Sequence, residues 1–135
     1  MEVYFMINEI YEFNRKVLGV DPRQMVLPLD LPEEEWLIAA LKEEIQEYED
    51  ANNLPEKVDA LIDLCYFAIG GLIKLGLNEE QTQDCFDAVH RANMTKKSGI
   101  NNTRPNDGSI VDAIKDENFQ DPTEVIKEII NGRLY

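Results

Sequence analysis

Cysteine is scarce in this chain of 135 residues, with only Cys65 and Cys85 present. Small secreted domains stapled by disulfides carry more cysteines, set in loops, whereas both of these fall within helical apolar patterns. We therefore expect two buried, reduced thiols and no disulfide framework. Residues 1–18 contain Glu2, Glu9 and Glu12 where a signal peptide would be basic and then apolar, so we expect a cytoplasmic protein.

Long apolar runs and basic residues are also lacking. No stretch reaches the roughly 18 uncharged apolar residues that a membrane span requires, which excludes a membrane partner. Lys and Arg number 13 against 27 Asp and Glu, a net charge of −14. This charge excludes direct nucleic-acid binding, because phosphate backbones attract basic patches. A phosphorylated ligand would need divalent cations, which invert the charge of an acidic site.

Histidine occurs once, as His90, and the chain has no internal repeat or low-complexity segment. A carboxylate-bridged di-iron bundle needs two Glu-x-x-His pairs, so a single histidine excludes that class of metalloprotein. The content of 44% apolar and 30% charged residues is typical of a globular chain. At this length we expect one domain, over residues 1–135.

Helical periodicity and capping residues predict five helices, over residues 3–18, 30–52, 55–75, 78–99 and 121–132. Prolines mark a loop at 20–30, and turn residues mark a mobile loop after Gly99, so that 100–135 forms a loop and a short helix. The third helix carries no charge from Leu64 to Ile73, which is typical of the centre of a bundle. The fold class expected is all-α, a four- to five-helix bundle.

Three glutamates of the second predicted helix differ in how they lie relative to its apolar stripe. Glu44 falls at the edge of the stripe and Glu47 lies one turn further along, whereas Glu43 falls on the far side. The stripe consists of Leu37, Leu41, Ile45 and Tyr48. Glu44 and Glu47 are therefore candidates for a site that faces the neighbouring helix.

The third predicted helix stacks Glu56, Asp59 and Asp63 along one face, and Asp63 directly precedes the charge-free run. Desolvated carboxylates and like charges on one face are unfavourable unless they are compensated. Magnesium compensates such charges through oxygen ligands. The alternative is a solvated face with ion pairs to lysine, and Glu56 lies at a helix start, where an acid is expected in any case.

The end of the fourth predicted helix is the one dense basic patch in the sequence. His90, Asn93 and Lys97 share a face there, with Lys96 close by. Basic residues at a helix C-terminus commonly just complement the helix dipole. Beside a metal cluster, however, these side chains are the donors that a polyphosphate requires.

Three blocks of this sequence resemble the all-alpha nucleoside triphosphate pyrophosphohydrolases, the superfamily of MazG and dimeric dUTPases. The resemblance is to the branch related to phosphoribosyl-ATP pyrophosphohydrolase, and it spans residues 37–99, about half of the chain. The blocks are Leu41-Lys-Glu-Glu-Ile-Gln-Glu-Tyr-Glu-Asp-Ala, Val58-Asp-Ala-Leu-Ile-Asp-Leu-Cys-Tyr and Val89-His-Arg-Ala-Asn-Met-Thr-Lys-Lys. Each block is weak alone, but their order and spacing together are specific.

The resemblance implies that Glu44, Glu47 and Asp63 bind Mg²⁺, for which Mn²⁺ could substitute, and that Asn93 and Lys96 contact the phosphates. The family's second motif is usually Glu-x-x-Asp, but the position three before Asp63 is an alanine here. Asp59 or Glu56 is then the candidate for the fourth ligand.

The reaction implied is attack of an activated water on a nucleotide, which releases a nucleoside monophosphate and pyrophosphate. Glu43 or Glu47 would orient the water. The resemblance also implies a homodimer or homotetramer. From the Gly, Pro and Asn content of the tail after Gly99, we expect that tail to close over the site. The competing hypothesis is a non-catalytic acidic helical interaction module, in which the charges are simply surface. Trp36, Tyr66 or Phe86 could stack on a base, although aromatic residues at helical spacing more often belong to a core.

Overall fold

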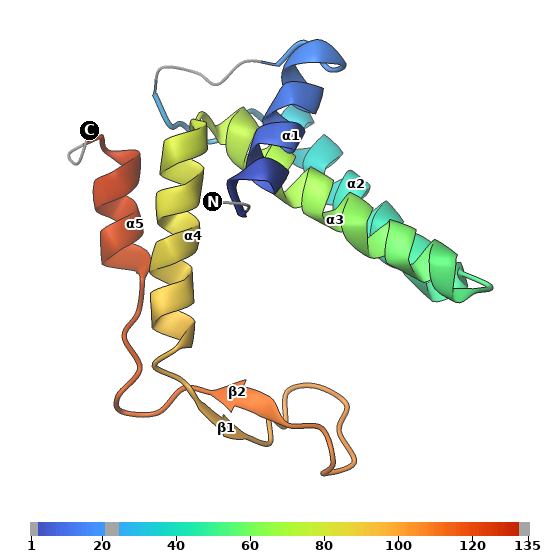
Figure 1. The fold of residues 1–135 in the computed structure, drawn as a ribbon, viewed down its shortest axis with the longest axis vertical. Helices are drawn as coiled ribbons and strands as arrows, with labels where there is room; N and C mark the ends of the chain where they lie inside the picture. The colour runs from blue at the N-terminus through green and yellow to red at the C-terminus, as the bar shows by residue number, and fades with distance from the viewer. Residues whose placement is uncertain (1–2, 21–24, 133–135) are drawn as a thin grey trace. The chain divides into compact units, whose positions relative to one another are not determined.

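The computed structural model describes residues 3–20 and 25–132. Within these residues the chain forms five helices and one two-stranded sheet, which confirms the all-α class (Figure 1). The elements are α1 (Val3–Lys16), α2 (Leu31–Asp50), α3 (Leu54–Leu75), α4 (Glu79–Asn93), β1 (Lys97–Gly99), β2 (Asp112–Ile114) and α5 (Thr123–Ile130). The loop expected at 20–30 falls partly on residues 21–24, which lie outside the described residues.

Side-chain caps explain where α2, α3 and α4 begin. The Asp30 carboxylate accepts a hydrogen bond from the Glu33 backbone N–H at 2.9 Å, and the Asn53 side chain accepts one from Glu56 N–H at 2.9 Å. Asn78 and Gln81 exchange reciprocal bonds at 2.8 and 3.0 Å, which is a capping box at the start of the helix predicted over 78–99. These bonds satisfy backbone donors that have no partner within the helix.

Gly76 ends α3 in the left-handed region, with φ of 110°. A β-carbon at this position would collide with the backbone carbonyl of Met25, so the turn requires glycine for space as well as for conformation. The chain before α2 therefore passes directly against the end of α3.

The chain divides into two compact units, Met1–Thr82 and Gln83–Tyr135. In the first unit, α2 and α3 form an antiparallel hairpin joined through Ala51–Asn53, and α1 packs on α3 (Figure 1). The core of this unit consists of Ile7, Ile10, Tyr11 and Ile73. Burial of these apolar side chains holds α1 across α3.

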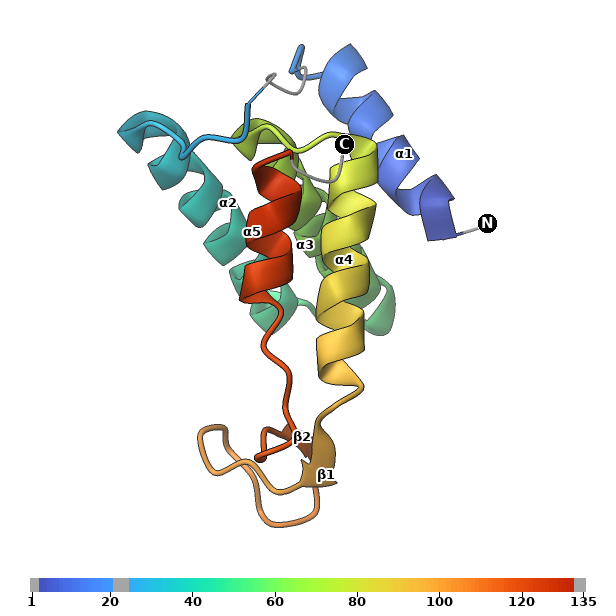
Figure 2. The same ribbon diagram turned by 90° about the vertical axis from the view of Figure 1, so that its left-hand side faces the viewer.

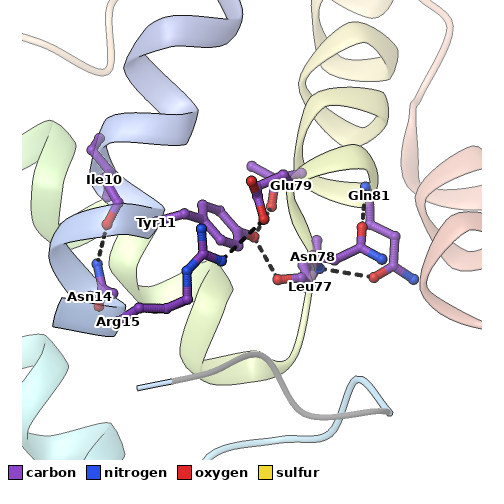
Figure 3. A network of polar contacts seen from close by, with 9 residues as sticks. Ile10, Tyr11, Asn14, Arg15, Leu77, Asn78, Glu79 and Gln81 are labelled. Carbon is purple, nitrogen blue, oxygen red and sulfur yellow. Dashed lines mark hydrogen bonds and ion pairs between the residues drawn. The ribbon is translucent and has the colours of Figure 1, made fainter. Parts of the chain in front are cut away.

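A buried tyrosine links α1 to the end of α3 (Figure 3). The Tyr11 hydroxyl donates to the Leu77 carbonyl at 2.5 Å, so its 2.8 Å bond with Thr82 Oγ1 is one in which Thr82 donates. Burial, the main cause, raises the pKa of Tyr11 to about 12. Arg15 and Glu79 form an ion pair at 3.3 Å at the edge of this network.

The second unit contains most of α4, the sheet and α5, which lies beside α4 in both views (Figures 1 and 2). The strands are antiparallel and pair Lys97 with Ile114 and Gly99 with Asp112. The final helix was expected from Asp121 to Gly132 and spans Thr123–Ile130. The Asp121 carboxylate accepts a bond from the Thr123 backbone N–H at 2.8 Å just before the helix begins.

The prediction that the fourth helix continues to Gly99 was wrong, because α4 ends at Asn93. The Thr95 hydroxyl donates to the Ala92 carbonyl at 2.7 Å, and the chain then turns into β1. Gly99 fits this strand closely, since a β-carbon there would lie 2.7 Å from Ile114 Cγ1. Pairing with a strand far along the chain thus competes with helix continuation.

Three predictions of burial were also wrong. Ile45 and Tyr48 of the expected stripe are exposed, and the residues of α2 that are buried are Ala40 and Glu44. Cys85 is buried as expected, but Cys65 is exposed, so the charge-free part of α3 is not covered on every side. No disulfide involves either thiol. The helical period shows which residues share a face of a helix, but tertiary packing decides which face is buried.

No single helix in the described part of the chain combines the length and apolar character needed to cross a membrane, although α3 and α4 taken together across the break between them reach both.

Candidate active site

Glu44 and Glu47 from α2 and Asp63 from α3 form an acidic cluster. One carboxylate oxygen from each residue can be chosen so that all three lie within 4.8 Å of one another. The packing of α2 against α3 brings them together, since Glu44 and Glu47 are one turn apart and Asp63 lies on the facing helix. The sequence-based prediction that these three side chains converge agrees with this geometry.

Glu44 is the member of the acidic cluster that is removed from water, with 8% of its surface exposed. Its Oε2 atom is buried and has no hydrogen-bond partner among the residues that the structure describes. Ala60, where the family's motif usually has glutamate, is itself buried. A buried carboxylate oxygen without a partner is costly, so this position demands a cation or a proton.

The electrostatics of the cluster point to the same need. Burial is the main cause that raises the pKa of Glu44 to about 7, followed by a carboxyl–carboxyl hydrogen bond and repulsion from Glu47. Burial also raises the pKa of Asp63, together with repulsion from Asp59 and Glu47. Like charges held close in a desolvated place are the condition under which oxygen-ligated divalent cations bind. The acidic cluster can therefore hold such a cation.

Further acids of the two helices line a groove of about 360 Å³, here called the acidic groove. Glu47 belongs to both the acidic cluster and the acidic groove, which places the groove next to the cluster. The lining residues are Glu43, Gln46, Glu47, Asp50, Ala51, Glu56 and Asp59. Glu43 was expected on the solvated side of the helix, and its side chain is exposed.

The two candidates for the fourth ligand differ in their contacts. Glu56 Oε2 accepts a hydrogen bond from the Asn52 backbone N–H at 2.9 Å, so its carboxylate helps to cap α3. Asp59 lies one turn before Asp63 and raises its pKa by repulsion. Asp59 therefore acts electrostatically on the acidic cluster, whereas Glu56 is engaged in the helix start.

A cavity of about 570 Å³, here called the aromatic cavity, opens among the three helices of the first unit. Asp63 lines this cavity as well as belonging to the acidic cluster. The other lining residues are Phe13, Asn14, Leu18, Trp36, Tyr66, Phe67, Gly70 and Lys74. An apolar cavity with a few polar groups, next to a carboxylate cluster, is typical of a small-molecule site.

Ring contacts organise the wall of the aromatic cavity. Phe13 packs edge-on against Tyr66 with centroids 5.5 Å apart, and Trp36 packs against Phe67 at 5.9 Å. The Lys74 ammonium lies 4.6 Å from the centroid of the Trp36 ring. Trp36 and Tyr66 were candidates for stacking on a base, and both line this cavity, whereas Phe86 is exposed on α4.

The four predicted phosphate-contacting residues belong to the second unit. His90 and Asn93 lie exposed in the last turn of α4, and Lys96 follows the helix with its ammonium 5.8 Å from the Phe119 ring. Lys97 lies in β1, and its ammonium group forms an ion pair with the Asp116 carboxylate at 4.0 Å. The expected face of His90, Asn93 and Lys97 on one helix is therefore wrong, because α4 ends before Lys97.

Asn14 and Gly70 are lining residues that the sequence did not single out. Asn14 is 2% exposed on α1, and Gly70 faces its amide. The signal was present, since Asn14 is a polar residue at a position where the helical period places an apolar one. A buried polar residue in an apolar stripe indicates either a binding site or a hydrogen bond that stabilises the fold.

A family model described as phosphoribosyl-ATP pyrophosphohydrolase matches residues 20–93, more than half of the chain. The matched range contains the whole acidic cluster and ends at the last residue of α4, and Asn14 lies before it. This match confirms the resemblance drawn from the three sequence blocks. No curated protein matches the sequence.

Proposed function

The chain belongs to the phosphoribosyl-ATP pyrophosphohydrolase family, and on that premise we propose that it is a magnesium-dependent nucleotide pyrophosphohydrolase. Membership of the family indicates hydrolysis of a nucleotide between phosphates. The finer proposal is that a ribo- or deoxyribonucleoside triphosphate, or a related nucleotide, yields the monophosphate and pyrophosphate. The observation that carries it is the acidic cluster, whose buried Glu44 oxygen has no partner among the described residues.

The donor set of the acidic cluster fits magnesium. Hard divalent cations take carboxylate oxygens, and Mg²⁺ is commonly bound by few carboxylates together with water and substrate phosphates. Glu44, Glu47 and Asp63 would hold the ion, and Asp59 would be the fourth ligand because its carboxylate already acts on Asp63. Mn²⁺ suits the same oxygen ligands.

When bound, the ion neutralises phosphate oxygens and lowers the pKa of water. The chain's own contribution is to orient that water with Glu43 or Glu47, both of which line the acidic groove. The carboxylate accepts the proton while the water oxygen bonds to phosphorus and the bond to the pyrophosphate oxygen breaks. His90, Asn93, Lys96 and Lys97 are proposed to donate to the phosphate chain.

Replacement of each candidate base separates their roles. Glu43→Gln removes a carboxylate of the acidic groove and leaves the acidic cluster complete, whereas Glu47→Gln removes one that belongs to both. If Glu43 orients the water, Glu43→Gln lowers kcat and leaves the magnesium concentration for half-maximal rate unchanged. If Glu47 orients the water, Glu43→Gln leaves kcat unchanged. Glu47→Gln then lowers kcat and also raises the magnesium concentration for half-maximal rate.

The competing hypothesis, an acidic interaction module, predicts that the carboxylates are surface groups. Glu44 does not fit that description, because it is buried beside two other carboxylates. The test is a panel of ribo- and deoxyribonucleoside triphosphates and phosphoribosyl-ATP, assayed for pyrophosphate with magnesium and with EDTA. We expect release with magnesium only. Release that survives EDTA, or no release from any nucleotide, would overturn the proposal.

We also propose that the protein works in the cytoplasm as a homodimer or homotetramer, with a nucleotide as its small-molecule partner. Apolar side chains of α3 that repeat at helical spacing are exposed in the single chain, namely Leu54, Val58, Leu61 and Ile62. A second copy that packs on this face would bury them. Sedimentation equilibrium measures the mass directly, and a monomer at micromolar concentration would contradict the proposal.

A further inference from the structure

Asn14 lines the aromatic cavity, and its amide oxygen Oδ1 is buried without a hydrogen-bond partner among the described residues. We infer that this cavity binds the nucleobase of the substrate and that Asn14 Oδ1 selects bases carrying an exocyclic amino group, as in cytosine and adenine. The inference rests on the proposed function for the statement that the substrate is a nucleotide. The position of the base and its selection by Asn14 rest on the residues that line the aromatic cavity.

The orientation of the Asn14 amide is determined by the helix that carries it. The Asn14 NH₂ group donates to the Ile10 backbone carbonyl at 2.9 Å (Figure 3). Only the nitrogen can make this bond, because a carbonyl does not donate, so the amide oxygen must occupy the other position. Oδ1 is buried and has no hydrogen-bond partner among the described residues. A buried acceptor left in this state is unusual and is expected to have a ligand or a water.

The surroundings of Asn14 suit a flat heterocycle. The aromatic cavity is lined by two edge-on ring pairs, and its volume of about 570 Å³ accommodates a base with its sugar. Gly70 leaves room at the amide, since a β-carbon there would lie 3.6 Å from Asn14 Oδ1. Rings that meet a base in such a cavity bury apolar area on its faces and leave its polar edge to the amide.

Asp63 connects the aromatic cavity to the acidic cluster, because the residue lines the cavity and its carboxylate belongs to the cluster. A nucleotide has the same two parts in the same order, an apolar ring at one end and an anionic phosphate chain at the other. With the base in the cavity, the phosphates extend toward the acidic cluster. With the base outside the cavity, only a water could donate to the Asn14 acceptor.

The acceptor discriminates between base edges. Cytosine N4 and adenine N6 present N–H donors, whereas uracil O4 and hypoxanthine O6 are carbonyl acceptors at the same positions. An oxo base held in the same position would set two lone-pair-bearing oxygens against each other, and it would have to shift to offer its ring N–H to Asn14 Oδ1 instead. The expected preference for the amino base is at least about tenfold within each pair.

Trp36 provides a readout of binding that needs neither phosphate nor metal. It is the one tryptophan of the chain and it lines the aromatic cavity. The protein is titrated in EDTA with deoxycytidine, deoxyuridine, adenosine and inosine, while tryptophan fluorescence is excited at the long-wavelength edge of its absorption. We expect saturable quenching at lower concentration with the amino member of each pair. No saturable change with any of the four nucleosides would overturn the base site.

Two variants separate the role of Asn14 from that of the cavity. Asn14→Leu removes the acceptor at similar volume, and the amino-to-oxo preference should fall to about one. The matched control is Asn8→Leu, on the exposed side of the same helix, which should keep the preference. Gly70→Ala adds a methyl group that would lie 3.6 Å from Asn14 Oδ1 and take up space beside this acceptor, so it should weaken binding of all four nucleosides and lower the preference for the amino member. If Asn14→Leu fails to fold, Gly70→Ala still tests the cavity.

The outcomes distinguish this inference from the proposed function. Equal quenching by amino and oxo nucleosides would overturn the selection by Asn14, even if pyrophosphate release from nucleotides is observed. Selective quenching without magnesium-dependent release from any nucleotide would support the base site and contradict the enzyme. A preference that survives in Asn14→Leu would assign the discrimination to another residue and overturn the inference.

Discussion

Two groups of carboxylates lie on the same pair of helices and differ in what surrounds them. In the acidic cluster, Glu44 is buried, and burial with neighbouring charge raises its pKa to about 7. In the acidic groove, Glu43, Asp50 and Asp59 are exposed to solvent. The groove holds more acids, yet the cluster has the stronger need for a cation. Desolvation, and not the number of charges, therefore distinguishes a metal site from a charged surface.

The largest expected effect is on catalysis by the acidic cluster. Glu44→Gln and Asp63→Asn each remove one carboxylate of the proposed metal site while preserving shape, and we expect kcat/KM to fall by at least about a hundredfold. Steady-state release of pyrophosphate with saturating magnesium measures this. Glu49→Gln, an exposed position on the same helix, is the matched control and should stay near wild type. Similar losses at all three positions would remove the distinction between cluster and surface.

The second effect is on the pH dependence of stability in the metal-free protein. The folded-state pKa of Glu44 is about 7, above its ordinary 4.5, so folding favours the protonated form. This contribution is complete below pH 4.5 and is lost as the pH rises to about 7. We expect the wild type to lose on the order of 3 kcal/mol relative to Glu44→Gln over that range. Urea unfolding in EDTA at a series of pH values measures it, and parallel curves for the two proteins would contradict the burial argument.

A smaller effect should separate the two candidates for the fourth ligand. Asp59→Asn is expected to raise the magnesium concentration for half-maximal activity by about tenfold, because the variant lacks the carboxylate proposed as the fourth ligand. Glu56→Gln should leave that requirement unchanged and lower stability slightly through its bond to the Asn52 N–H. Magnesium titrations of both variants decide the assignment, and the reverse order would give the ligand role to Glu56.

The smallest effect is expected within the acidic groove. Asp50 accepts a hydrogen bond from Gln46 at 3.0 Å on the exposed surface of α2. We expect Asp50→Asn to change the free energy of unfolding by no more than about 0.5 kcal/mol, with or without magnesium. Paired thermal melts measure this. A clear stabilisation that disappears when magnesium is added would show that the groove also binds the ion.

Local signals were sufficient for most of the helices. Asp30 and the pair Asn78–Gln81 begin the helices that the sequence predicts at those positions, because a cap depends on residues within one turn. Asn53, which caps α3, was not predicted as a cap. The convergence of Glu44 and Asp63 agrees with the family resemblance, and a short connection makes α2 and α3 antiparallel neighbours. Where the signal is local in sequence, the prediction was accurate.

Contacts between distant segments of the chain explain the predictions that were wrong. Lys97 left the expected helix because β1 pairs with β2, and no residue near Lys97 carries that information. Ile45 appeared to belong to the apolar stripe, but the face of α2 that is covered is the one with Ala40 and Glu44. The aromatic cavity needs side chains from α1, α2 and α3 together.

By itself the sequence determined that this protein is all-helical and where three of its helices begin, because these depend on the helical period and on caps within a turn. The resemblance of three sequence blocks to a known family, and not the helical period, indicated which carboxylates approach one another. The tertiary structure alone decided which of those carboxylates loses its water, where α4 ends, and that a residue of α1 with a buried amide oxygen lines the same cavity as Asp63. Burial depends on the packing of residues far apart in the chain, and no local pattern encodes it.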